Sequence, residues 1–160
     1  MSEKHEPIII IGAGPAGLAV AGRLKHAGFN SLILEQTDQA GSSWVNHYDR
    51  LHLHTIKEYS HLPHLPLPEN WPQYISKNQL IEHLQAYVEK FDLSVEFNQN
   101  VKRVTHADGR WSISTEQEEN YSADKVVVCT GYNRVPVQPT WLGQDVFTGS
   151  LIHSRAYRNA

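Results

Sequence analysis

The stretch at residues 8–24 constrains the fold of this chain more than any other. Four consecutive isoleucines at residues 8–11 lead directly into the motif Gly12-Ala13-Gly14-Pro15-Ala16-Gly17. After Gly17 the apolar residues change to the spacing of one helix face. The pattern predicts a strand, a tight turn and a helix, which together open a doubly wound α/β sheet.

The glycines of this motif predict a dinucleotide site. Gly12 lets the chain turn sharply, Gly14 leaves room for a pyrophosphate, and Gly17 lets the helix approach the strand. The helix start offers unpaired N–H groups and the positive end of the helix dipole to phosphates. Pro15 fits the first helical turn, because the N–H that it lacks has no partner there.

Glu35 extends the dinucleotide signature. An apolar run at residues 31–34 ends in this acid, 23 residues after Gly12. The spacing is close to the roughly 20 residues expected for a carboxylate that binds a ribose 2′-hydroxyl. Residues 36–38 include no Arg or Lys that would hold a 2′-phosphate. The first site is therefore predicted to take FAD or NAD rather than NADP.

Composition restricts the class of protein. The chain has 160 residues, 40% of them apolar, with one cysteine and a net charge of −3. This length corresponds to one domain, and the absence of a basic patch argues against nucleic-acid binding. The start is too polar for a secretory signal, and no apolar run is long enough for a membrane span. We expect a soluble, cytoplasmic protein without disulfides.

A long insertion at residues 36–76 follows the second strand. It contains Gly41-Ser42-Ser43-Trp44, and four prolines between Pro63 and Pro72 exclude a regular helix there. Its tryptophan, tyrosine and leucine content is too high for a disordered segment. We expect an ordered cover over a ligand.

The five histidines of this insertion do not form a metal site by their pattern. His52 and His54 would share one face of an extended segment, but no cysteine joins them. Asp49 and Glu58 are the nearby acids, and either could pair with Arg50 at the surface. No metal is predicted. The five histidines are His47, His52, His54, His61 and His64.

A second helix is expected after the insertion. Ser76 and Gln79 have the spacing of a capping box. The apolar residues that follow form one stripe at helical spacing, so this helix packs on the core. The stripe consists of Leu80, Leu84, Tyr87, Val88 and Phe91.

Short strands complete the predicted sheet. Residues 93–97 alternate as a strand, and a β-meander follows over 101–105, 110–115 and the residues from 121, with a turn at 107–109. Residues 125–131 form an apolar run typical of a strand buried on both faces. Ligands bind beyond the carboxyl ends of such strands, so the turns at Gly12, Glu35 and Thr130-Gly131 are expected to converge.

These motifs together resemble the FAD domain of flavoproteins with two dinucleotide-binding domains, and in particular the flavin-containing monooxygenases of class B. That group carries the pattern Phe-x-Gly-x-x-x-His-x-x-x-(Tyr/Phe), which Phe147, Gly149, His153 and Tyr157 fit. The related Baeyer–Villiger enzymes have Trp at the last position. Residues 53–55, the proline-rich loop and residues 74–79 are also similar to this group.

The resemblance implies a role in FAD binding for each matched residue. The pyrophosphate would be bound by Gly12, Ala13, Gly14, Pro15, Ala16 and Gly17. The adenosine ribose would be bound by Glu35 with Gln36 beside it, and the adenine by the backbone of Val101. The ribityl chain and the flavin ring would be contacted by Ser43, Trp44, His54 and Thr55. The adenosine and pyrophosphate would be covered by Thr130, Gly131 and Tyr132.

The resemblance also implies a domain division and a reaction. Residues 1–135 would form a Rossmann-like FAD-binding domain, incomplete at its C-terminus, and residues 136–160 a linker towards an NADPH-binding domain that the sequence lacks. In this family NADPH reduces the flavin, which adds O₂ at C4a and oxygenates a small organic substrate. Residues 1–160 alone are expected to bind FAD weakly or not at all, and not to turn over.

Two alternatives remain open from the sequence. The chain could be a truncated, inert FAD-binding remnant, or one half of a split enzyme whose C-terminal half is encoded elsewhere. It could instead be an NAD-dependent dehydrogenase, which Glu35 permits. A simple dehydrogenase does not need the loop around Trp44 or the β-meander. Flavin absorption by the purified protein would separate these classes.

Overall fold

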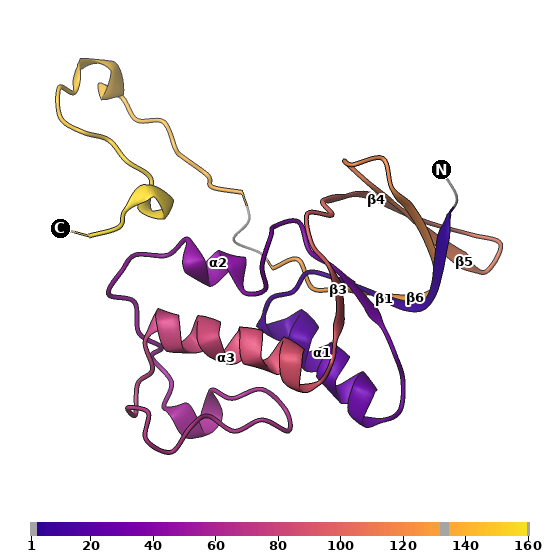
Figure 1. Cartoon of the computed structure of the whole chain (residues 1–160). Coiled ribbons are helices and arrows are strands. Elements are labelled where there is room, and N and C mark those ends of the chain that lie inside the picture. Colours follow the sequence, from indigo (N-terminus) through magenta and orange to yellow (C-terminus); the bar gives the residue numbers. More distant parts are fainter. Residues whose placement is uncertain (1–2, 132–134, 160) are drawn as a thin grey trace.

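The computed structural model of the chain describes residues 3–131 and 135–159. Its centre is a six-stranded sheet in the order β3-β2-β1-β6-β5-β4 (Figure 1). The parallel part pairs β1 (Lys4–Ile11) with β2 (Leu32–Leu34) and β6 (Asn120–Val128), and β2 with β3 (Ser94–Glu96). The antiparallel part pairs β5 (Arg110–Thr115) with β6 and with β4 (Val101–Ala107). This topology confirms the predicted Rossmann-like α/β sheet with a β-meander.

Two helices cover one face of the parallel strands. They are α1 (Pro15–His26) and α3 (Lys77–Lys90), and they lie side by side below the sheet in Figure 1. The remaining helical segments are short: α2 (Ser42–Val45) and the 3₁₀ turns η1 (Lys57–Tyr59), η2 (Gln144–Val146) and η3 (Ser154–Ala156). Among the described residues, no helix has the length and apolar character that crossing a membrane requires.

Local sequence signals set the ends of both long helices. Pro15 occupies the first position of α1, and Gly28 lies just beyond its end with φ +84°. This confirms the predicted stop, because glycine adopts such a φ without strain. At the start of α3 the Gln79 N–H donates to Ser76 Oγ (3.3 Å), and the Ser76 N–H donates to Gln79 Oε1 (3.0 Å). The predicted capping box is confirmed.

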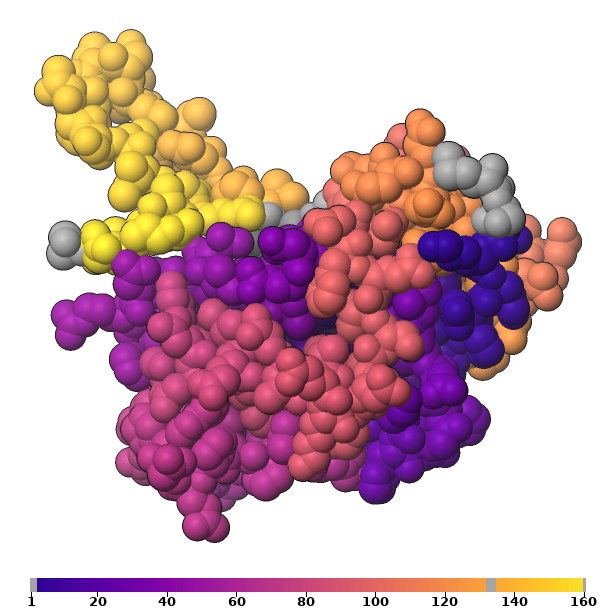
Figure 2. Space-filling view, in the orientation of Figure 1, coloured from indigo at the N-terminus to yellow at the C-terminus, as the bar shows by residue number. Residues whose placement is uncertain are grey.

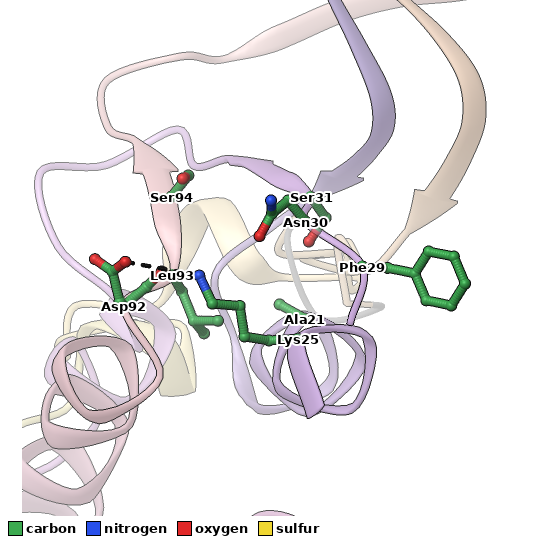
Figure 3. Close-up of a pocket in the computed structure, with 8 residues that line it drawn as sticks. All are labelled: Ala21, Lys25, Phe29, Asn30, Ser31, Asp92, Leu93 and Ser94. Carbon is green, nitrogen blue, oxygen red and sulfur yellow. Dashed lines mark hydrogen bonds and ion pairs between the residues drawn. The ribbon is translucent and has the colours of Figure 1, made fainter. Parts of the chain in front are cut away.

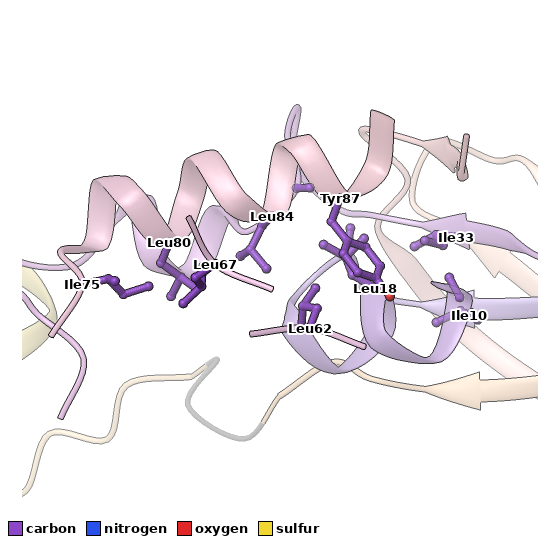
Figure 4. Close-up of a cluster of buried hydrophobic side chains, with 12 residues drawn as sticks. Ile10, Leu18, Ile33, Leu62, Leu67, Ile75, Leu80, Leu84 and Tyr87 are labelled. Atoms are coloured by element: carbon purple, nitrogen blue, oxygen red, sulfur yellow. The ribbon is translucent and has the colours of Figure 1, made fainter. Parts of the chain in front are cut away.

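The main core lies between the helices and the sheet (Figure 4). Ile10 and Ile33 from the strands meet Leu18 of α1 and Leu84 of α3, all fully buried. Tyr87 also points into this core, as the apolar stripe predicted. Burying these side chains supplies the main driving force that holds α1 and α3 on the sheet.

A close approach of α1 and α3 depends on a glycine that the sequence pattern did not reveal. A Cβ atom at Gly22 would lie 1.9 Å from Tyr87 Oη, so only a hydrogen fits there. Through this gap the Tyr87 hydroxyl donates to the Pro63 carbonyl (2.9 Å). Burial raises the pKa of Tyr87, so the phenol remains a donor. The contact joins the proline-rich loop to both helices.

The β-meander covers the opposite face of the parallel strands. Ile9 and Ile11 of β1 pack with Ile113 of β5 and Tyr121 of β6. Trp111 and Ile113 belong to this cluster and Thr115 is buried, so the predicted shared face of these residues is confirmed. The Tyr121 hydroxyl donates to the Glu96 carboxylate (2.7 Å), which closes the cluster at one edge.

One strand prediction is wrong. Residues 121–131 were expected to end a meander and then form a strand buried on both faces, but β6 is one continuous strand that ends at Val128. Val128 is 64% exposed. The reason is the pairing: β5 opposes β6 only along residues 120–123, so in the described part of the chain no strand borders the outer edge of residues 125–128.

The insertion and the tail differ in how they pack. The insertion at residues 36–76 is ordered and contributes Leu62, Leu67 and Ile75 to the main core. The tail at residues 135–159 is mostly exposed and extends from the rest of the molecule (Figures 1 and 2). It returns so that its last described residues lie against the segment after α2, where Arg158 Nη1 donates to the Asn46 carbonyl (2.7 Å).

Candidate dinucleotide site

The turn after β1 joins the ends of three parallel strands. The Gly12 N–H donates to the Leu34 carbonyl at the end of β2 (2.8 Å), and the Cys129 N–H donates to the Ile11 carbonyl (2.8 Å). Gly12 has φ +107°, and a Cβ atom there would lie 2.6 Å from the Cys129 carbonyl oxygen. Residues 12, 35 and 130 therefore follow strand ends that lie together, which confirms the predicted convergence of these turns.

The start of α1 is open to a ligand. Gly14 is its N-cap and makes no side-chain cap, and a Cβ atom at Gly14 would meet no atom within 4 Å. The N–H groups of Ala16 and Gly17 lie in the first turn, where a helix provides no backbone acceptor. Gly17 shows the opposite environment, since a Cβ atom there would lie 1.9 Å from the Gly12 carbonyl oxygen. The space and the unpaired N–H groups fit an anionic group such as a pyrophosphate.

Glu35 points into this turn. Its Oε2 atom accepts a hydrogen bond from the Ala13 N–H at 2.7 Å, and the residue is only 6% exposed. Its Oε1 atom accepts from the Thr37 N–H (3.1 Å) and the Thr37 hydroxyl (2.8 Å), with the Ser42 hydroxyl at 3.5 Å. The carboxylate thus holds the glycine turn through the Ala13 N–H, and Oε2 still has a lone pair for a further donor.

Two neighbours of Glu35 were missed by the sequence reasoning. Thr37 orients the carboxylate, and its position two residues after the acid is the one local signal that could have suggested this. The Gln99 N–H donates to the Glu35 carbonyl (2.8 Å), and Gln99 Oε1 is buried without a hydrogen-bond partner among the described residues. An unpaired buried acceptor is costly, so it suits a ligand N–H.

The α2 segment is tied to the glycine turn through Ala13. The Gly41 N–H donates to the Ala13 carbonyl (3.0 Å), and Gly41 has φ +72°. A Cβ atom at Gly41 would lie 2.7 Å from Leu84 of α3, so this residue also fixes how closely α2 approaches α3. Trp44 is half-buried against the core, while Ser43 is exposed.

The other predicted site residues differ in their environments, and Thr130 follows the strand end that borders the Gly12 turn. Five of them are exposed: Gln36, His54, Thr55, Thr130 and Gly131. The Thr55 hydroxyl bonds to the Ser60 hydroxyl (2.7 Å). The η1 turn that follows Thr55 lies below α3 in Figure 1, whereas α2 lies above it. Val101 begins β4 and is half-buried beside Thr115. Tyr132 lies outside the described residues.

The four signature residues make contacts within the tail and, through Tyr157, with the segment after α2. The Phe147 ring lies over Gly149, where a Cβ atom would be 2.4 Å from Phe147 Cζ. His153 is the N-cap of η3, and its Nδ1 atom accepts from the Arg155 N–H (3.0 Å). The Tyr157 ring lies 6.3 Å from that of Tyr48. These contacts shape the tail and attach its end to the segment after α2.

A small pocket lies at the amino ends of the parallel strands, opposite to the end that would hold a dinucleotide. Its lining includes Ser31, which precedes β2, and Ser94, the first residue of β3, together with Lys25 and Asp92 (Figure 3). The Lys25 ammonium bonds to the Asp92 carbonyl (3.2 Å) and lies 3.6 Å from its carboxylate. The glycine turn follows the carboxyl end of β1, whereas this pocket lies at the amino ends of β2 and β3. Because these strands are parallel, the two places are at opposite ends of the strands.

The surroundings of Cys129 and of the histidines indicate structural rather than reactive or metal-binding roles. Burial raises the pKa of the Cys129 thiol, which favours its protonated, unreactive form. In the part of the chain that the structure describes, no three His, Cys, Asp or Glu side chains are grouped to hold a metal ion. His64 stacks on His26 with ring centroids 3.9 Å apart and lies 2.8 Å from Arg23 Nη1.

The sequence match decides the family. Residues 9–160 match the pattern of the pyridine nucleotide-disulphide oxidoreductase family. The chain belongs to this family. Over 154 residues it is 42% identical to YUCCA4 of Arabidopsis thaliana, a probable indole-3-pyruvate monooxygenase; the match covers 94% of the chain and 37% of that protein. The chain thus spans about two fifths of the curated relative.

Two of the solved structures with a similar fold are monooxygenases. A flavin-containing monooxygenase from Stenotrophomonas maltophilia superposes with a TM-score of 0.87 at 27% identity, over 97% of this chain and 47% of that one. A cyclohexanone monooxygenase superposes with a TM-score of 0.80 at 26% identity, over 98% of this chain and 31% of that one. The resemblance of the chain to the flavin-containing monooxygenases is confirmed.

Proposed function

We propose that this chain is the FAD-binding portion of an NADPH-dependent flavin monooxygenase. The observation that carries the proposal is the pairing of a buried Glu35 carboxylate with the Ala13 N–H beside an open helix start at Gly14. This arrangement offers a hydroxyl acceptor and a phosphate cradle next to each other. The monooxygenase relatives support the chemistry.

The proposal assigns FAD to the residues around this turn. Residues 12–17 hold the pyrophosphate on the first turn of α1, and Glu35 Oε2 accepts a ribose hydroxyl, with Gln36 beside it. Val101 meets the adenine through its backbone, and the unpaired Gln99 Oε1 accepts an N–H of the ring. Thr130, Gly131 and Tyr132 close over the adenosine and pyrophosphate.

The α2 segment and the insertion take the flavin end. Ser43 and Trp44 contact the ribityl chain and the ring, and His54 and Thr55 approach the ring from the insertion. When bound, FAD supplies hydride acceptance from NADPH and the activation of O₂ for transfer to a small organic substrate. The chain's own residues bind and orient it, and Trp44 excludes water from one side.

The remaining assignments follow the same proposal. Residues 1–135 form the FAD-binding unit, and residues 136–160, with Phe147, Gly149, His153 and Tyr157, lead towards an NADPH-binding unit. NADPH and the substrate are held by parts of the enzyme outside this sequence, supplied by a longer chain or by a separately encoded half. The single cysteine, which cannot form a disulfide within the chain, agrees with a cytoplasmic setting.

Titration of the purified chain with FAD tests the proposal. Binding is read from the change in flavin absorption and fluorescence, with NAD⁺ titrated in parallel as the competing ligand. We expect FAD to bind, and NAD⁺ to bind at least about tenfold more weakly, because NAD⁺ lacks the flavin ring and so loses the contacts to it. NADPH consumption by the isolated chain is expected to stay at background. Binding of NAD⁺ without FAD would identify a dehydrogenase fragment, and binding of neither would overturn the proposal that these residues suffice to hold FAD.

A further inference from the structure

The last described residues of the tail dock on the segment that follows α2. The Asp49 N–H donates to the Arg158 carbonyl (2.9 Å), and Asn159 Nδ2 donates to Asp49 Oδ2 (2.9 Å) across 110 residues of sequence. Arg158 Nη1 donates to the Asn46 carbonyl at the end of α2 (2.7 Å). Both the backbone N–H and the carboxylate of Asp49 thus bind the tail.

Asp49 is held from its other side by α3. Lys77 Nζ lies 3.4 Å from Asp49 Oδ1 and donates to the His47 carbonyl (2.8 Å). The Lys77 side chain is 11% exposed, so its ammonium depends on these acceptors. Hydrogen bonds from Asn159 and then from Lys77 lower the pKa of Asp49. The segment is therefore fixed to the helical core independently of the tail.

Aromatic rings continue the connection towards α2. The Tyr157 ring lies 6.3 Å from Tyr48, Tyr48 lies 6.3 Å from His47, and His47 lies 5.8 Å from Trp44. Contacts of this kind favour defined ring orientations. The row starts in the tail and ends in α2.

α2 leads in turn to the glycine turn. Its N-cap, Gly41, donates its N–H to the Ala13 carbonyl (3.0 Å), and the Ala13 N–H is the donor to Glu35. A continuous set of contacts therefore runs from the tail through Asp49 and α2 to the candidate cofactor site.

We propose that Asp49 is a positioning residue that couples docking of residues 157–159 to the placement of α2 and Trp44 beside the bound FAD. The proposal rests on the proposed function. With the tail docked, the segment after α2 is held from two sides, by Lys77 and by the tail. With the tail released, α2 loses one support, Trp44 gains rotational freedom, and FAD is bound less tightly.

Two substitutions at Asp49 and a matched control test the coupling. Asp49→Asn removes the charge but keeps the backbone N–H and the shape, whereas Asp49→Ala removes every side-chain bond. Asp145→Asn makes the same chemical change at an exposed acid of the tail. Circular dichroism melting establishes that each variant is folded.

Tail docking is read without FAD, from the rate of trypsin cleavage after Arg155 and Arg158 followed by mass spectrometry. We expect cleavage about threefold faster in Asp49→Asn and about tenfold faster in Asp49→Ala, with Asp145→Asn unchanged. Coupling is read from FAD titrations, in which we expect the dissociation constant to rise about threefold in Asp49→Ala. The bound flavin is expected to fluoresce more strongly, because a loosened Trp44 quenches it less.

Equal cleavage of the wild type and both Asp49 variants would overturn docking through Asp49. Faster cleavage with an unchanged FAD dissociation constant and unchanged flavin fluorescence would overturn the coupling while leaving the proposed function intact. A wild type that binds no FAD would overturn the proposed function and the coupling together, and tail docking would then be judged by cleavage alone.

Discussion

The Glu35 carboxylate accepts a 2.7 Å hydrogen bond from the backbone N–H of Ala13 inside the turn between β1 and α1. The bond joins the end of β2 to the middle of the glycine motif. It means that this acid has a structural task in the folded chain besides its proposed contact with a ribose. The two tasks use the same oxygen atom, but they can be measured separately, as stability and as FAD affinity.

Replacement of Glu35 tests both tasks. Glu35→Ala leaves the buried Ala13 N–H and the Thr37 hydroxyl without their acceptor, so we expect a loss of about 2–3 kcal/mol in the free energy of unfolding. Glu35→Gln retains an acceptor for Ala13 and is expected to fold with a smaller loss, yet to bind FAD about tenfold more weakly. Urea unfolding and FAD titration measure the two effects. Glu69→Gln, at an exposed acid, is the control.

The glycines at 14 and 17 are expected to respond in opposite ways. A Cβ atom at Gly14 meets no protein atom, so Gly14→Ala should leave the melting temperature nearly unchanged and weaken FAD binding by filling the cradle. A Cβ atom at Gly17 collides with the Gly12 carbonyl, so Gly17→Ala should lower stability by about 2 kcal/mol or more. Unchanged FAD affinity in a folded Gly14→Ala protein would contradict a pyrophosphate at this turn.

Gly22 is predicted to limit the distance between α1 and α3. Gly22→Ala places a methyl group against Tyr87 and should destabilise the fold by about 1–3 kcal/mol, although alanine is the better helix former. Tyr87→Phe removes the nearest atom of the clash, so the loss caused by Gly22→Ala should be smaller in that background. A double-mutant cycle of unfolding free energies measures the coupling. Additive effects would argue against this contact.

Stability is predicted to fall on mild acidification because of His83. This ring is 4% exposed and accepts the Leu62 N–H at 3.4 Å. Burial, and secondarily His61, lowers the pKa of His83 below its ordinary value of 6.5. The unfolded state therefore binds a proton first, so the contribution is complete above about pH 6.5 and is lost as the pH falls through the lowered pKa.

The His83 prediction is checked by melting the protein between about pH 7 and pH 5. His83→Gln retains an acceptor without a titrating group, so its melting temperature should change less with pH than that of the wild type. His52→Gln, at an exposed histidine, is the control. The pKa of His64 is also lowered, by burial and then by His26 and Arg23, so a residual slope in His83→Gln is expected. Identical pH profiles of the wild type and His83→Gln would contradict the assignment.

Local spacing in the sequence was enough for the elements that frame the site. The run into Gly12, the Ser76 capping box and the stop at Gly28 all act within a few residues, so a pattern can reveal them. Glu35 was predictable because its distance from Gly12 is set by one strand, helix and strand unit. The strand at 125–128 was misjudged, since its burial depends on which strand borders its edge rather than on its own apolar residues.

The sequence by itself determined the type of unit at residues 8–35, the acid that ends it and the family of the chain. Only the tertiary structure decided that Gly22 admits the Tyr87 hydroxyl, that Thr37 and Ala13 share the Glu35 carboxylate, and that Asp49 receives the end of the tail. The physical reason is that periodicity and capping act along one element. Contacts between side chains of different elements depend on how closely those elements pack, and no spacing along the chain encodes that distance.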